Sequence, residues 1–152
     1  MDAKLVARLR AETGAGVMDC KKALEESRGD FEKAKAILEN NAAAIAKKKS
    51  ERSANQGLIE CYCHGGKIGV LLELACETDF VAKNEEFKNL AHDLSMQVVS
   101  MNPKNIEELF SGAYIKDESL TIKKLIEQTV GKIGENIQVK RFIRYELGEE
   151  IK

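Results

Sequence analysis

The side chains that could bind a metal or act as nucleophiles are few in this chain. The stretch CYCH at 61–64 gathers three possible zinc ligands, and Cys76 is the next cysteine along the chain. Zinc requires its ligands within one coordination sphere. If residues 58–63 and 68–76 pair as a hairpin, Cys61 faces Val70, and Cys76 lies roughly 20 Å further along at about 3.3 Å per residue. We therefore expect reduced thiols and no metal site.

No motif for nucleotide chemistry or covalent catalysis is found in the sequence. The pattern G-x-x-x-x-G-K-[ST] is absent, and TGAG at 13–16 is followed by apolar residues without the lysine. Neither His64, in a predicted turn, nor His92, in a predicted helix, has an assignable Ser or Cys partner. We expect no enzyme activity and no cofactor, with a thiol enzyme built on Cys61 and Cys63 as a rival interpretation.

The residue that needs an explanation is Phe80, in the stretch ACETDFVAKNEEF at 75–87. Thr78 or Asp79 can cap the turn that follows a predicted strand, which puts Phe80 near the tip of the joint. Two interpretations are open. The ring folds back as a hydrophobic staple against the helix beginning at Glu85, or it stays uncovered so that another protein can enclose it.

The first 52 residues predict a three-helix module. Leu5 and Leu9 lie four residues apart in a helical run over 3–12, and Asp19 and Asp30 can cap two further helices. Those two helices cover residues 20–27 and 31–40. Each helix is too short to be stable unless it packs on the others. The basic stretch at 46–55 follows as a linker or as a solvated extension of the third helix.

Residues 53–152 predict an α+β core. Strict alternation places Val70, Leu72, Leu74 and Cys76 on one face of a strand that pairs with the preceding one. A helix capped by Asn84 follows over 85–101, then a turn-rich passage at 102–118. A second helix over 122–133 and a third strand over 137–147 complete the chain. The order strand, strand, helix, helix, strand predicts helices laid over one face of a small antiparallel sheet.

The charge balance and hydropathy limit the classes of partner. The chain of 152 residues has 24 Lys and Arg against 25 Asp and Glu, a formal net charge of -1. Such a chain has no overall field to hold nucleic acid or a membrane surface. There is no run of about 18 apolar residues. We therefore expect a soluble protein of the cytoplasm that binds neither nucleic acid nor membranes.

Three separate stretches resemble the elongation factor Ts family. They are TGAGVMDCKKAL at 13–24, ETDFVAKNEEF at 77–87 and KIGENIQVKRF at 132–142. The resemblance implies a guanine-nucleotide exchange factor for the translational GTPase elongation factor Tu, bound in its GDP and nucleotide-free forms. It also implies that the three-helix module is like a ubiquitin-associated domain.

The resemblance also implies contact residues, carried over onto matching positions of this chain. In the family, the Thr-Asp-Phe segment enters beside the partner's magnesium and phosphate site, with the aromatic ring wedged between partner helices. The segment corresponds to Thr78, Asp79 and Phe80, with Val81 following. The N-terminal module and the KIGEN turn also contact the partner, which adds the following candidates: Arg10, Val17, Met18, Lys21, Ile133 and Gly134.

The chain departs from the commoner long members of this family. It has one hairpin unit, looks reduced between Pro103 and Thr121, and ends just after its third strand. Short members can replace the second subdomain by dimerising, so a homodimer through the sheet is expected, with a role for His64 in binding left open. The alternative function is a ubiquitin-associated-like adaptor without exchange activity.

Overall fold

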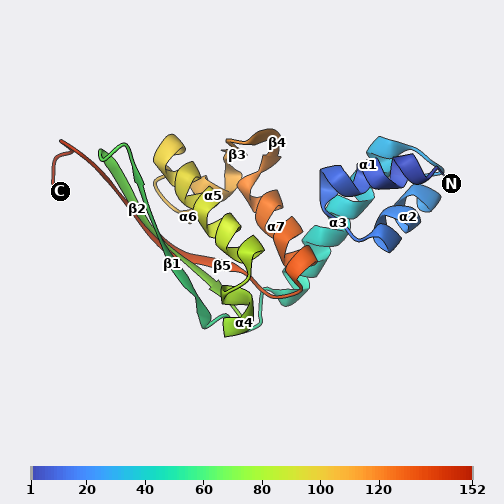
Figure 1. Ribbon diagram of the computed structural model, residues 1–152, viewed down its shortest axis with the longest axis horizontal. Coiled ribbons are helices and arrows are strands. Elements are labelled where there is room, and N and C mark those ends of the chain that lie inside the picture. The colour runs from blue at the N-terminus through green and yellow to red at the C-terminus, as the bar shows by residue number, and fades with distance from the viewer. Residues whose placement is uncertain (1, 152) are drawn as a thin grey trace.

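Three helices form the N-terminal end of the computed structural model, which describes residues 2–151 (Figure 1). They are α1 (Ala3–Thr13), α2 (Val17–Glu26) and α3 (Phe31–Lys49). Their facing sides enclose a small hydrophobic cluster, whose buried members are Leu9, Cys20, Ala23, Leu24, Ala34 and Leu38. The predicted three-helix module is therefore present, and each helix buries its apolar stripe against the other two.

Two boundaries of these helices differ from the sequence prediction. Asp30 caps α3 as expected, because its carboxylate accepts a hydrogen bond from the Lys33 N–H at 3.1 Å. Asp19 was predicted to cap α2, but that is wrong: Gly16 is the N-cap, and Asp19 lies in the first turn, where a negative charge still complements the helix dipole. The third helix continues to Lys49, so residues 46–49 of the basic stretch extend the helix, while residues 50–55 form the linker to the sheet.

A three-stranded antiparallel sheet lies at the other end of the molecule (Figure 1). Its strands are β1 (Gln56–His64), β2 (Ile68–Cys76) and β5 (Gln138–Glu146), with β2 in the centre. The alternation predicted for β2 is confirmed, since Val70, Leu72, Leu74 and Cys76 are all buried. The register of the hairpin was predicted one residue off, because Cys61 pairs with Leu71 and not with Val70.

Helices cover one face of this sheet and leave the other face to solvent (Figure 1). The predicted helices are α5 (Glu85–Met101), capped by the Asn84 side chain, and α7 (Ile122–Ile133). The passage at 102–118 was predicted as turns but also holds α6 (Ile106–Ser111), β3 (Ala113–Tyr114) and the start of β4 (Asp117–Thr121). A further short helix, α4 (Asp79–Ala82), joins β2 to α5. The fold is α+β, as predicted.

The long α3 connects the two ends of the molecule by packing along α7. Gly131 of α7 faces Ala42 of α3 where the two helices cross. The helices are so close there that a Cβ added to Gly131 would lie 3.8 Å from the Cβ of Ala42. Nearby, the Lys124 ammonium group pairs with the Glu39 carboxylate at 2.9 Å. The small residues allow close approach of the two helices, so the N-terminal module is fixed to the core by a helix-on-helix contact.

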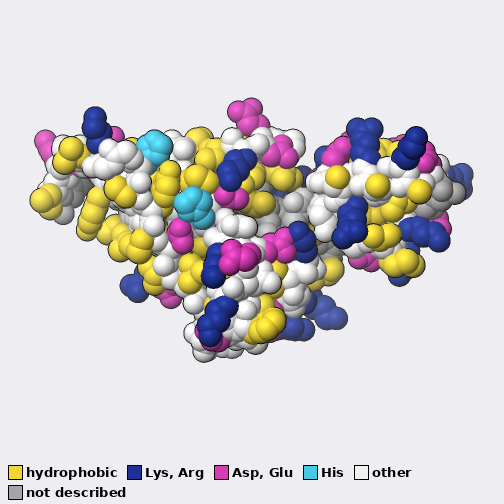
Figure 2. All heavy atoms as spheres, in the orientation of Figure 1, with side chains coloured by type: hydrophobic (Ala, Val, Ile, Leu, Met, Phe, Trp, Pro, Cys, Tyr) yellow, Lys and Arg dark blue, Asp and Glu magenta, His cyan; other side chains and the backbone are white. Residues whose placement is uncertain are grey.

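The structure has two hydrophobic clusters, one within α1–α3 and one between the sheet and its covering helices. The predicted division into domains at 1–52 and 53–152 stays a prediction, and residues 1 and 152 lie outside the described residues. Acidic and basic side chains are interspersed over the visible face of the molecule (Figure 2). Within residues 2–151, no helix is both long and apolar enough to cross a membrane.

Candidate functional site

Phe80 lies on the surface, with the residue 83% exposed. The staple interpretation is therefore wrong. Thr78 is the N-cap of α4, and its hydroxyl accepts a hydrogen bond from the Val81 N–H at 3.3 Å. Successive residues on a helix point about 100° apart. As a result Val81 and Ala82 enter the core while Phe80 points away from it.

Val81 is buried, although the sequence suggested that it lies on the contact surface. It was a candidate contact residue, but it is 7% exposed and belongs to the larger hydrophobic cluster. Its side chain is enclosed by the protein itself, so it anchors α4 and offers no surface to a partner. This assignment of Val81 is corrected because its burial depends on the sheet and helices around it, which the local sequence did not reveal.

Asp79 is exposed beside Phe80 and pairs with Lys83 one helical turn later, at 2.6 Å between the carboxylate and the ammonium group. The hydrogen bond and charge of Asp79 raise the pKa of the Lys83 amine. A surface pair of this kind contributes little to stability. The carboxylate therefore remains available to a competing cation or donor on another molecule.

Glu135 holds the joint in place and was not singled out from the sequence. Its carboxylate accepts three hydrogen bonds: from the Glu77 N–H at 2.9 Å, the Thr78 N–H at 3.0 Å and the Thr78 hydroxyl at 2.6 Å. Glu135 is in the KIGEN turn, 57 residues after Thr78. No local pattern in the sequence connects these two positions. The turn and the joint therefore form one site, which we call the Thr-Asp-Phe joint with its KIGEN turn.

The KIGEN turn places Ile133 and Gly134 next to this joint. Gly134 caps the C-terminus of α7 with a φ of 87°, a left-handed conformation that glycine adopts without strain. Its carbonyl accepts a hydrogen bond from the Lys49 ammonium group. Ile133 is half-buried and packs against the larger cluster. Of the two predicted residues, Gly134 shapes the turn and Ile133 shows part of its side chain.

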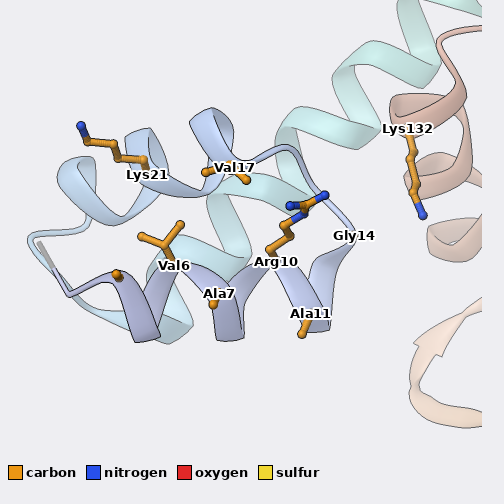
Figure 3. Close-up of a pocket in the computed structure, with 9 residues that line it drawn as sticks. Val6, Ala7, Arg10, Ala11, Gly14, Val17, Lys21 and Lys132 are labelled. Atoms are coloured by element: carbon orange, nitrogen blue, oxygen red, sulfur yellow. The ribbon is translucent and has the colours of Figure 1, made fainter.

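The N-terminal candidates line or flank a groove of about 820 Å³ (Figure 3). Val6 and Arg10 of α1 and Val17 and Lys21 of α2 contribute to it. Met18 is 62% exposed and Val17 48%, so neither is a core residue. Of the four candidates, Arg10, Val17 and Lys21 line this groove, while Met18 is exposed next to Val17 on α2; their contact with a partner stays a prediction.

Lys132 of α7 completes the lining of this groove from the side of the core (Figure 3). Its ammonium group forms an ion pair with Glu86 at the start of α5. Lys132 is also the first residue of the KIGEN stretch, so one residue of that stretch lines the groove. No local pattern indicated this contact, because Lys132 and the N-terminal module are brought together by the packing of α3 on α7.

His64 is not part of either region. It is the last residue of β1, at the hairpin turn, while the joint follows the opposite end of β2. The nine residues of β1 span eight steps from Gln56 to His64, roughly 26 Å at about 3.3 Å per step. The ring of His64 accepts or donates a hydrogen bond with the Tyr62 hydroxyl at 3.0 Å.

The cysteines differ in exposure and in acidity. Cys61 and Cys63 are exposed on β1, while Cys20 and Cys76 are buried. Burial raises the pKa of the Cys20 thiol and raises that of Cys76 to about 11, where nearby Glu135 adds to the effect. Within residues 2–151 no group of three His, Cys, Asp or Glu side chains is arranged to hold a metal ion.

Comparison with known proteins finds a consistent family. The sequence model described as Elongation factor TS matches residues 77–152. The chain is 42% identical to an elongation factor Ts of Thermotoga neapolitana, over 96% of each chain. It is 41% identical to that of Coprothermobacter proteolyticus, over 98% of this chain and 99% of the relative.

A third relative shows that lengths vary among these proteins. Elongation factor Ts of a Nostoc species is 48% identical over 99% of this chain, which spans only 48% of the relative. The alignment with the Thermotoga relative runs over 190 positions, against 152 residues in this chain. That relative therefore has internal residues with no counterpart here.

The cysteine environments predict selective alkylation. With iodoacetamide at pH 8, at a protein concentration low enough for the chain to be monomeric, we expect Cys61 and Cys63 to react within minutes and Cys20 and Cys76 to stay unmodified in the folded protein. A thiol with a pKa of about 11 has little thiolate at that pH, and the thiolate is the nucleophile. Peptide mass spectrometry after alkylation measures this, and denatured protein is the control in which all four react. Rapid labelling of Cys76 in the folded chain would contradict its buried position.

Proposed function

The chain belongs to the elongation factor Ts family of translation elongation factors, and from that premise we propose that it releases GDP from the translational GTPase elongation factor Tu. In this proposal the Thr78-Asp79-Phe80 segment enters beside the partner's magnesium and phosphate site. The observation that carries the proposal is the uncovered ring of Phe80. A phenyl ring held in solvent by its own fold gains burial only when another surface encloses it.

An exchange factor performs no covalent step and acts through differences in affinity. It must bind the nucleotide-free partner more tightly than the GDP-bound one, and by linkage it weakens GDP binding by the same factor. A Phe side chain buries about 150 Å² or more, worth roughly 4 kcal/mol at about 25 cal/mol per Å² before ordering costs. Phe80 alone could therefore shift GDP affinity by up to about a thousandfold.

Asp79 would add an electrostatic contribution to the same step. Its carboxylate is exposed beside the ring and is held only by the surface pair with Lys83. Brought near a phosphate and its magnesium ion, a carboxylate repels the phosphate and competes for the cation. The return of the nucleotide is then disfavoured while the complex persists.

The N-terminal groove would supply affinity. Val17 and Met18 are apolar and exposed, and cationic side chains of Arg10, Lys21 and Lys132 surround the groove. An apolar centre within a polar rim is the usual composition of a protein–protein contact. This surface fits a partner helix with apolar side chains at its centre and carboxylates at its edge.

A homodimer through the open face of the sheet is the second part of the proposal. On that face Cys61, Leu71 and Ile143 form one row across the three strands. Leu71 is 48% exposed and Ile143 44%, and Ile59 and Tyr145 extend the same apolar face. Such a contiguous face on a sheet is typical of an interface, and a second copy would present the identical surface.

Replacing the ring tests the central proposal. We expect Phe80→Ala to slow stimulated GDP release from elongation factor Tu at least about tenfold, because the ring's burial is lost. Stopped-flow fluorescence with a labelled GDP measures the rate. The unfolding free energy should change by less than about 0.5 kcal/mol, since the ring is exposed in the free protein.

Leu147→Ala, also at an exposed apolar residue, is the matched control. It should stimulate GDP release from elongation factor Tu at the same rate as the unaltered chain. Unchanged release by Phe80→Ala would refute the wedge role. If the unaltered chain binds the partner but does not stimulate release, the adaptor alternative is favoured.

The N-terminal groove predicts an effect on affinity. We expect Met18→Ala to weaken binding to nucleotide-free elongation factor Tu about tenfold, while the release rate at saturating protein stays unchanged. Isothermal titration calorimetry gives the affinity. Met101→Ala replaces an equally exposed methionine at the end of α5 and should bind normally. Equal affinities of the two variants would contradict the proposed anchor.

The sheet face predicts the oligomeric state. Light scattering of the unaltered chain should give about twice the chain mass of 16.9 kDa. Leu71→Lys should give the monomer mass, because a buried ammonium group without a partner disrupts an apolar interface. Ile115→Lys, at an exposed residue outside the sheet, should stay dimeric. A monomer mass for the unaltered chain would contradict the dimer.

A further inference from the structure

Three segments that are distant in the sequence meet behind the Thr-Asp-Phe joint. Glu135 accepts its three hydrogen bonds from Glu77 and Thr78, as described above. In return, the Glu77 carboxylate accepts a hydrogen bond from the Asn136 N–H at 2.7 Å. Two acidic residues thus bind each other's loops reciprocally through protein hydrogen bonds.

The third segment is the end of the basic linker. The Asn136 side chain is 4% exposed and donates to the Arg52 carbonyl at 2.7 Å. The Arg52 guanidinium group lies 3.7 Å from the Glu77 carboxylate. A buried amide of this kind is costly to leave without partners, so the linker, the turn and the joint form one connected unit.

The joint depends on this unit because α4 cannot hold itself. It has only four residues, too few to be stable alone. The Thr78 hydroxyl donates to Glu135 and also accepts from the Val81 N–H, so the Thr78 side chain links Glu135 to the first turn of α4. The direction in which Phe80 points is set by that turn.

We propose that Glu135 is the positioning residue of nucleotide exchange: its carboxylate orients Thr78 and α4 so that Phe80 is presented in one direction before the partner arrives. This inference rests on the proposed function. Glu135 need not touch the nucleotide or the ring. It acts by holding Phe80 in the direction from which the ring must enter the partner's site.

The inference separates orientation from affinity. Removing the Glu135 carboxylate should lower the maximal rate of GDP release more than it weakens binding to the partner, because the N-terminal groove remains intact. A misplacement of a positioned group by about 1 Å can cost up to about a hundredfold in rate. A role confined to stability would leave the rate of the folded protein unchanged.

Glu135→Ala in the full chain is the test. We expect maximal GDP release from elongation factor Tu to fall at least about tenfold and affinity for the nucleotide-free partner to change within about threefold. Glu135→Gln keeps the shape and one carbonyl oxygen for the two backbone N–H groups, so it should restore most of the rate. Glu118→Ala removes an exposed carboxylate on β4 and serves as the matched control.

A measurement without the partner completes the test. Hydrogen exchange followed by mass spectrometry should show faster amide exchange over residues 77–83 in Glu135→Ala, with α5 still protected. Thr78→Val removes the hydroxyl from the same contact. In the double variant with Glu135→Ala, the loss of rate should be smaller than the product of the two single losses.

The outcomes distinguish this inference from the function on which it rests. If the unaltered chain does not stimulate GDP release, the proposed function fails and the role of Glu135 fails with it. If the unaltered chain stimulates release and Glu135→Ala does so at the same maximal rate, only the positioning role is overturned. Unchanged hydrogen exchange over residues 77–83 would also overturn it.

Discussion

An exposed ring can stay at one place only if its backbone is held by something other than the ring itself. Phe80 contributes almost no burial of its own. Its helix is held instead by two neighbours, Val81 and Ala82, which enter the core, and by the Glu135 carboxylate, which binds the residues just before the helix. Hydrophobic burial fixes the position of α4, and directional hydrogen bonds fix its orientation. The proposed site depends on both.

The contact of α3 with α7 determines how this site relates to the N-terminal groove. One end of α3 packs inside the three-helix cluster, and the other delivers Lys49 to the carbonyl of Gly134 in the KIGEN turn. The groove and the joint are therefore parts of one connected arrangement rather than two modules on a loose linker. Two contact regions held at a fixed separation can engage one partner together, which strengthens binding without new contacts.

Local signals predicted most of the secondary structure because they act within a few residues. Asp30 and Asn84 cap their helices as expected, and the alternation in β2 identifies its buried face. The errors have a common origin. The hairpin register was off by one residue, and the short elements α6, β3 and β4 were missed. Those short elements rely on distant partners, such as the buried Gln97 side chain, which donates to the Ala113 carbonyl at 2.8 Å.

The sequence by itself determined the α+β order of elements, the family resemblance and the residues that could form a contact surface, because periodicity, capping and motifs are written along the chain. The tertiary structure alone decided that Phe80 is exposed and Val81 buried, that Glu135 and Lys132 join the two contact regions, and that His64 lies far from both. Exposure and hydrogen-bond partners depend on which distant segments pack together. A local pattern carries no information about that pairing.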